Sequence, residues 1–183
     1  WTRSLLHPSV QTVFARLAVF TGTFTLEAAV AVVTDQCGCP PIDRLAVIDA
    51  LQALVDASLV TRSDAKSGTP HYRLPESPRL FAMQCLHEAK QQDITRQRHL
   101  AWYLGWVDRA SVADLRSEQA PLLSMLDWAL SGGDLVGGAH LAKRLLAHPG
   151  LVALQEAAPA GSATRADPDD AVLARLLSRI QRA

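Results

Sequence analysis

Cysteine and histidine are the residues in this sequence most able to hold a metal or to form a nucleophile and base. Cys37 and Cys39 are separated by a single residue, which is tighter than the spacing in a zinc knuckle, and no second ligand pair follows. His87-Glu88 lacks the second histidine of a zinc-binding helix, and no Gly-x-Ser-x-Gly segment positions a serine nucleophile. We therefore predict no metal site and no catalytic centre, so the chain is not expected to be an enzyme.

Glycine-rich segments are the next candidates, because backbone N–H groups in such loops can hold phosphates. The sequence has no G-x-x-x-x-G-K-[ST] pattern, and neither Gly132-Gly133 nor Gly137-Gly138 is followed by Lys-Ser or Lys-Thr. Both pairs are typical of helix ends and close helix packing. We therefore expect no cofactor to bind to this chain by itself.

Composition excludes further classes of function. The 183 residues hold 18 Lys and Arg against 18 Asp and Glu, so the net charge of zero favours neither nucleic acid nor a membrane surface. The longest apolar run, residues 28–33, is too short to span a bilayer, and no signal-peptide pattern is present. Three cysteines do not make a disulfide framework. We expect a cytoplasmic protein without membrane contact and, because it opens on Trp1, part of a longer one.

Hydrophobic spacing predicts the elements of the first part of the chain. Helices are expected at residues 8–19, 26–34 and 42–56, with Thr25 as the cap of the second. The third helix has an apolar stripe, made by Ile42, Leu45, Ile48, Leu51, Leu54 and Val55. Strands at residues 58–62 and 71–74, joined by a polar turn, predict a hairpin. Three helices followed by a hairpin indicate a winged helix over residues 1–75.

The remainder is predicted to be helical. Helices are expected at residues 78–91, 94–112, 118–131 and 134–147, the first two capped by Ser77 and Asp93. Trp102, Tyr103 and Trp106, together with Cys85, are interpreted as packing residues. The fold class is mainly α: a winged helix, then antiparallel helical hairpins at residues 76–150, a linker at 151–166 and an amphipathic helix at 167–183.

Several segments resemble one family in its order along the chain. Residues 17–29 (LAVFTGTFTLEAA), 51–60 (LQALVDASLV), 72–79 (YRLPESPR) and 99–104 (HLAWYL) resemble the winged-helix and tetratricopeptide-like region of STAND-type signal-transduction NTPases. The resemblance covers about residues 1–148. It implies an ATP- or ADP-binding NTPase domain upstream in the parent protein, and helical repeats that bind protein partners. Many bacterial members are transcriptional regulators.

The resemblance also suggests which residues touch the upstream domain. Leu74, Glu76 and Arg79 are the candidates for this interdomain contact. Eukaryotic relatives place a histidine that touches the ADP phosphates at the position of Pro75, which has no N–H and no charge. Direct contact between this segment and nucleotide is therefore not expected. The main hypothesis is a non-catalytic module that relays nucleotide state to downstream repeats through protein packing.

Two alternatives stay open. A winged helix can place its third helix in the DNA major groove, and the cations available here are Arg44, Arg62, Lys66 and Arg73. The polar positions of the third helix, however, are Asp43, Arg44, Asp49, Gln52 and Asp56, whose net charge of −2 phosphates would repel. We therefore expect DNA binding by this module to be disfavoured. The other alternative is a helical-repeat scaffold for protein partners.

Overall fold

The computed structural model describes residues 7–35, 41–64 and 70–149, and the chain forms two compact units. One unit ends at Trp102 and the other begins at Tyr103. The fold is mainly helical with a small antiparallel sheet, as predicted. The linker predicted at 151–166 and the helix predicted at 167–183 lie outside the described residues, as do Cys37, Cys39 and Lys66.

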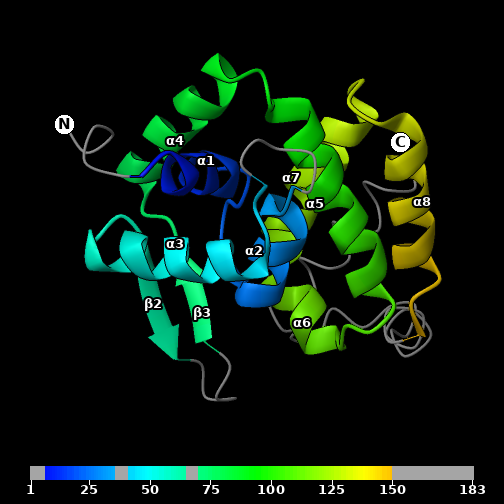
Figure 1. Cartoon of the computed structure of the whole chain (residues 1–183). Coiled ribbons are helices and arrows are strands. Elements are labelled where there is room, and N and C mark those ends of the chain that lie inside the picture. Colours follow the sequence, from blue (N-terminus) through cyan, green and yellow to red (C-terminus); the bar gives the residue numbers. More distant parts are fainter. Residues whose placement is uncertain (1–6, 36–40, 65–69, 150–183) are drawn as a thin grey trace. The chain divides into compact units, whose positions relative to one another are not determined.

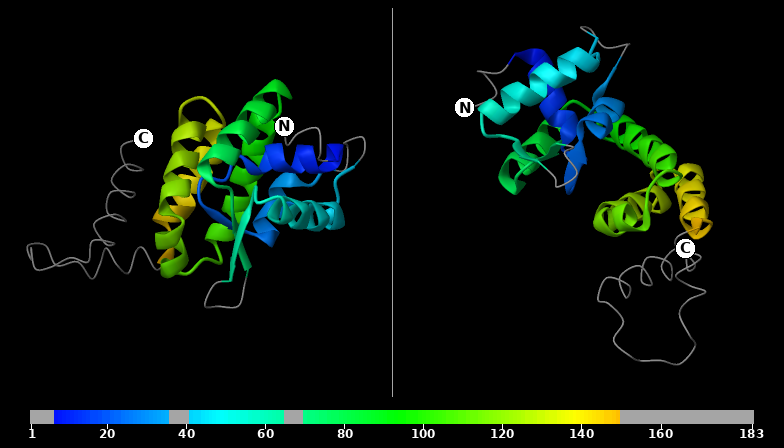
Figure 2. Two further views of the ribbon diagram at one scale, coloured as in Figure 1. Left: turned by 90° about the vertical axis from the view of Figure 1, so that its left-hand side faces the viewer. Right: turned by 90° about the horizontal axis from the view of Figure 1, so that it is seen from below.

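The first unit begins with the elements of a winged helix. In chain order these are α1 (Pro8–Leu17), β1 (Thr23–Thr25), α2 (Leu26–Val33), α3 (Arg44–Asp56), β2 (Thr61–Asp64) and β3 (Pro70–Arg73). The strands form one sheet in the order β1-β3-β2. β2 and β3 extend side by side as the wing hairpin (Figures 1 and 2). The sequence predicted this hairpin but not β1, whose three residues are too few for a visible alternation.

The core of this unit lies between the three helices and the sheet. Phe24 of β1 faces inward, with its ring centroid 4.5 Å from that of Phe20 and 6.0 Å from that of Tyr72. All three helices contribute fully buried apolar side chains, among them Val13, Leu17, Ala29, Val32, Val47 and Leu54. Burial of this surface is the main favourable contribution to folding of the winged helix.

Helix starts follow side-chain caps where the sequence offers them. Thr25 Oγ1 accepts a hydrogen bond from Ala28 N at 3.2 Å, which confirms the predicted cap of α2. Asp43 Oδ1 accepts from Ala46 N at 2.8 Å, so α3 begins after Asp43 and not at residue 42. Ile42 instead forms a backbone bridge with Asp35, with both N–H···O distances at 2.9 Å. This bridge ties the end of α2 to the start of α3.

Two helix ends use a left-handed residue other than glycine. Ser58 follows α3 with a φ of 57°, and Lys90 follows α4 with a φ of 54°. The conformation costs a side-chain-bearing residue about 1 kcal/mol, and it ends each helix by a turn. Because Ser58 belongs to this turn, β2 begins at Thr61 and not at the predicted residue 58.

The first unit continues with α4 (Glu76–Glu88) and the first part of α5 (Gln92–Val107). The prediction that Ser77 caps this helix is wrong. α4 begins at Glu76, directly after Pro75, and its start has no side-chain cap. Asp93 is likewise not a cap and lies in the first turn of α5. α5 is continuous through Trp102 and Tyr103, so one helix takes part in both units.

Up to residue 149, where the description ends, the second unit comprises the end of α5 followed by α6 (Val112–Ser117), α7 (Gln119–Leu130) and α8 (Leu135–Leu146). α6 was not predicted; Ser111 and Asp114 form a capping box that starts it, and this contact lowers the pKa of Asp114. α7 and α8 pack as a helical hairpin, turning at Gly132 with a φ of 105°. No helix in the described ranges is long and apolar enough to cross a bilayer.

The aromatic residues of α5 act as packing residues, as predicted. Tyr103 is 1% exposed, and its hydroxyl donates to Glu118 Oε2 at 3.0 Å. Burial raises the pKa of Tyr103 well above its usual range, so the phenol stays protonated. Trp102 is half-buried and packs against the core of the first unit, and Trp106 lies edge-on to Tyr103.

Candidate interaction face and the polar network behind it

The outward side of α3 is the candidate functional surface, because in a winged helix this element is free to meet a partner. We call its exposed residues the α3 face: Arg44, Leu45, Ile48, Asp49, Gln52 and Asp56. Leu45 is 68% exposed and Ile48 36% exposed. Their predicted place in a buried stripe is therefore wrong. Val47 and Ala50 take the core positions instead, because the buried arc of the helix is rotated from the predicted one.

Electrostatics of the α3 face disfavour a polyanion. Arg44 is the one Lys or Arg of α2 and α3, while Glu27, Asp43, Asp49 and Asp56 supply four exposed carboxylates. Arg44 Nη2 lies 4.0 Å from Glu27 Oε1, and both side chains are more than half exposed. Such a surface pair is weak, but it directs the single cation toward an acid on α2. The structure thus agrees with the charge pattern noted in the sequence.

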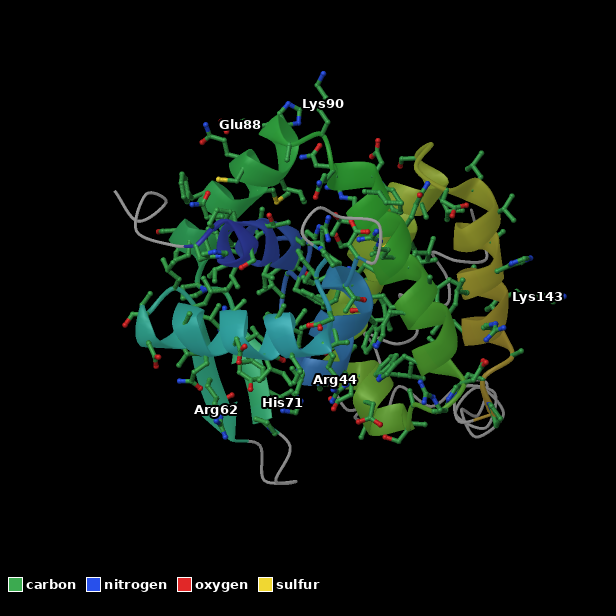
Figure 3. The ribbon with its side chains drawn as sticks, in the orientation of Figure 1. Arg44, Arg62, His71, Glu88, Lys90 and Lys143 are labelled. Carbon is green, nitrogen blue, oxygen red and sulfur yellow. The ribbon has the colours of Figure 1, made fainter. Side chains whose placement is uncertain are left out.

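The wing carries the other predicted DNA-contact residues. Arg62 lies on β2 and Arg73 ends β3, and both are exposed. Their cross-strand partners are Tyr72 and Thr61, so the two arginines project from opposite faces of the sheet. Figure 3 shows Arg44 on α3, and Arg62 and His71 on the two strands of the wing. Among the described residues, the candidate cations Arg44, Arg62 and Arg73 come from three separate elements and from both faces of one sheet, and do not form one stripe.

The predicted interdomain residues occupy different environments. Leu74 is 4% exposed and belongs to the core of the first unit, so its side chain is not on the surface. Glu76 is exposed at the start of α4, and Arg79 is half-buried with Nη1 3.6 Å from Met83 Sδ. Contact of Glu76 and Arg79 with another domain stays a prediction.

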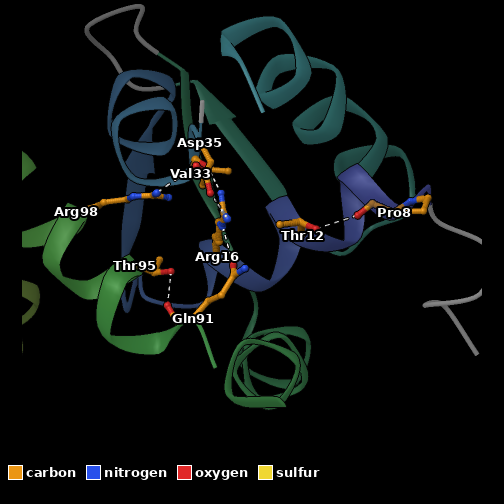
Figure 4. Close-up of polar contacts among 8 residues, drawn as sticks. All are labelled: Pro8, Thr12, Arg16, Val33, Asp35, Gln91, Thr95 and Arg98. Carbon is orange, nitrogen blue, oxygen red and sulfur yellow. Dashed lines mark hydrogen bonds and ion pairs between the residues drawn. The ribbon is translucent and has the colours of Figure 1, made fainter. Parts of the chain in front are cut away.

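A buried arginine lies behind the helix-turn-helix and was not singled out from the sequence. Arg16 is 3% exposed and donates to Gln91 Oε1 at 3.0 Å, Val33 O at 2.8 Å and Asp35 Oδ2 at 2.8 Å (Figure 4). Arg98 of α5 lies 3.5 Å from Asp35 Oδ1. Desolvation lowers the pKa of Arg16, and its hydrogen bond to Asp35 acts in the opposite direction by raising this pKa. The signal was its position on α1, between Val13 and Leu17 on the apolar side.

This Arg16 network links segments that are far apart in the sequence. It joins α1, the end of α2 and the start of α5, and Asp35 is also the residue whose backbone pairs with Ile42 ahead of α3. A charged pair at such a site needs all its partners, because an uncompensated buried charge is costly. Directed polar contacts from Gln91 and Arg98 therefore hold the start of α5 against α1 and the end of α2.

A small pocket lies between α1 and α4. Its volume is about 240 Å³, and Phe14, Leu59, Phe81 and Cys85 line it together with Gln11 and Gln91. Ligand sites span roughly 300–1,000 Å³, so the pocket is smaller than most of them. Cys85 is a free thiol and is half-buried, so it is less buried than its interpretation as a packing residue implies. Within the described ranges, no three potential metal ligands gather.

Comparison with known proteins agrees with this topology. A family model described as a winged helix-turn-helix domain matches residues 6–87. One protein from Mycobacterium bovis and two from Mycobacterium tuberculosis are each 30% identical to the chain over 155 residues, and each bears the name "Putative HTH-type transcriptional regulator". No solved structure matches the chain.

The matched segment is a small part of each mycobacterial relative. The aligned segment covers 79% of this chain but 17% of each mycobacterial relative, so the chain spans less than a fifth of their length. The order of helices and strands, the three-stranded sheet and the family match over residues 6–87 lead to one conclusion. The chain contains a winged helix-turn-helix domain and is homologous to these mycobacterial proteins.

Proposed function

We propose that this chain is a non-catalytic, cytoplasmic segment of a larger transcriptional regulator, and that its winged helix docks on protein. The homology to proteins named as HTH-type transcriptional regulators supports the regulatory class. Those names and the winged-helix match favour the DNA-binding alternative over a nucleotide relay, since they mention neither an NTPase nor helical repeats. The choice between protein and DNA as partner therefore depends on the surface itself.

The composition of the α3 face is the observation that supports protein docking. A recognition helix needs Arg, Lys, Asn or Gln aimed at base edges and phosphates. Here Leu45, Ile48, Asp49 and Asp56 fill most of the outward positions. The carboxylates would repel phosphates, and the apolar side chains gain more from an apolar partner surface than from a wet groove.

The relay remains the finer form of this proposal. The partner would be an upstream NTPase domain of the same parent chain, which would bind ATP or ADP, and the downstream helices would bind other proteins. The continuous α5 supports a mechanical role, because it belongs to the unit that holds the Arg16 network and to the helical hairpin unit. A relay requires two states with different contacts.

Fluorescence anisotropy with labelled duplex DNA of mixed sequence tests the proposal. The full chain at about 50 mM salt, where phosphate contacts are strongest, should leave the anisotropy unchanged at micromolar protein. The double variant Asp49→Lys/Asp56→Lys should gain salt-sensitive binding, because its α3 face becomes basic. Saturable, salt-sensitive binding of DNA by the unaltered chain would overturn protein docking as the main function.

DNA binding through the wing is the second candidate, favoured by the winged-helix topology and the names of the relatives. Exposed Arg62 and Arg73 would then supply phosphate contacts. Their replacement by Ala should weaken binding and lower the salt dependence by about one counterion per contact. The matched control is exposed Arg109→Ala in the second unit, which should leave any binding unchanged.

A further inference from the structure

We propose that the α3 face binds an amphipathic helix of a protein partner, and that this helix carries an apolar ridge with lysine or arginine along one flank. The inference rests on the protein-docking function proposed above and specifies the chemistry of the partner. It follows from how the exposed side chains are distributed around α3.

The apolar part of the α3 face forms a stripe along the helix. Counting about 100° per residue, Ile48, Gln52 and Leu45 occupy the middle of the exposed arc. Leu45 and Ile48 are one turn apart and 68% and 36% exposed, while neighbouring Val47 is fully buried. The stripe offers apolar contacts at the spacing that a facing helix uses to insert its own side chains.

Charge on the α3 face is asymmetric. In the same count, Asp49 and Asp56 lie together along one edge of the stripe, and Arg44 stands alone at the other. Gln52 Nε2 donates to Asp56 Oδ1 at 2.8 Å, which leaves the second oxygen of that carboxylate available. A partner cation on the Asp49 and Asp56 side would be attracted, whereas an acidic partner would be repelled there.

Lysine and arginine suit this edge for a second reason. Their aliphatic stems can cover the exposed parts of Leu45 and Ile48 while the charged groups reach the carboxylates. α3 has 13 residues, so it is about 20 Å long, and a helix of about four turns covers it. Charge complementarity along one edge and an exposed apolar centre together fit a basic amphipathic helix better than a nucleic acid.

Binding of two synthetic helices to the full chain tests the proposal. The first probe has leucines at i, i+3, i+4 and i+7 with lysines along one flank, and the second has glutamates in place of the lysines. By fluorescence anisotropy the lysine probe should bind saturably, and the glutamate probe should bind about tenfold more weakly or not at all. Equal binding of the two probes would overturn the charge part of the proposal.

Variants then assign the binding to the α3 face. Binding of the lysine probe should become about tenfold weaker in each of two double variants, Leu45→Ser/Ile48→Ser and Asp49→Lys/Asp56→Lys. The charge reversal should also let the glutamate probe bind. Because these side chains are exposed, folding should persist, as circular dichroism can show. The matched controls Leu80→Ser, at 58% exposure on α4, and Glu88→Lys/Asp93→Lys should leave binding unchanged.

The outcomes separate this inference from the proposed function. If neither probe binds and the chain also leaves DNA unbound, the partner chemistry is wrong while protein docking stands. If duplex DNA binds the full chain and Leu45→Ser/Ile48→Ser abolishes that binding, both are wrong. Equal weakening by the α4 and α3 variants would show that binding is nonspecific and would overturn the inference.

Discussion

Two buried ionisable side chains, Arg16 and His99, differ in whether they carry a charge. Arg16 keeps its charge because three acceptors surround its guanidinium. His99 is 2% exposed and packs by its ring, 4.6 Å from the ring of Phe20, and burial lowers its pKa to about 3. Arg16 is therefore stabilised as a cation, whereas His99 must remain neutral in the folded chain.

Stability should depend on pH through His99. The unfolded chain binds a proton at His99 near pH 6.5, but the folded chain does not bind one until about pH 3. The unfolded state therefore gains protons first as pH falls, and the free energy of unfolding decreases. Between pH 7 and pH 5 the loss should be about 2 kcal/mol, measured by urea unfolding.

A matched pair of variants isolates this effect. His99→Phe keeps an aromatic ring against Phe20 and should remove most of the decrease between pH 7 and pH 5, whatever it does to stability at pH 7. His140→Phe, at an exposed position of α8, should retain the decrease. The same pH dependence in both variants would show that His99 is not its source.

The secondary-structure elements show what sequence could and could not predict. The caps and apolar spacing around Thr25 located α2, and the polar turn after Asp64 located the wing hairpin. β1 escaped because its three residues acquire meaning only by pairing with β3. The sequence predicted that the polar residues of α3 point outward, but it did not predict the exposure of Leu45 and Ile48. Hydrophobic spacing alone does not say which of two apolar arcs faces the core.

The hairpin of α7 and α8 depends on a close approach at one glycine. A methyl group at Gly138 would lie 2.8 Å from Cβ of Ala129, whereas one at Gly105 of α5 would meet no atom within 4 Å. Gly138→Ala should lower the free energy of unfolding by about 1–3 kcal/mol through overpacking. Gly105→Ala should raise it by up to about 1 kcal/mol through helix propensity.

Urea unfolding followed by circular dichroism measures both changes. Since the substitution is the same and both glycines are helical, propensity cancels between the two variants and the difference reports packing. Stabilisation by both substitutions would mean that α7 and α8 are not held at the close approach described.

At the level of the whole molecule, the winged-helix unit extends past the segment that the family model matches. The match ends at residue 87, but the compact unit runs to Trp102. Gln91 and Arg98 complete the Arg16 network, and His99 lies against Phe20. The sequence placed the boundary at residue 75 because the hairpin ends there, and these long-range contacts leave no local pattern.

Truncation should show where the folding unit ends. A fragment of residues 1–107 keeps α5 and should unfold cooperatively in urea. A fragment of residues 1–87 loses Gln91 and Arg98, which contact Arg16 and Asp35, and exposes Phe20. The Arg16–Asp35 pair stays in this fragment, but the hydrogen bond from Arg16 to Gln91 is lost, so its free energy of unfolding should be lower by at least about 1.5–3 kcal/mol, the contribution of a hydrogen bond to a charged group. Equal urea midpoints would place the boundary before α5.

The continuity of α5 has a consequence for chimaeric regulators. Helices can be spliced only in phase, because adding or removing one residue rotates everything downstream by about 100°. A foreign effector module grafted after the winged helix would have to join within α5, near Trp102 and Tyr103, and keep its turn count. Recombination just after the wing would instead remove Gln91 from Arg16 and Arg98 from Asp35.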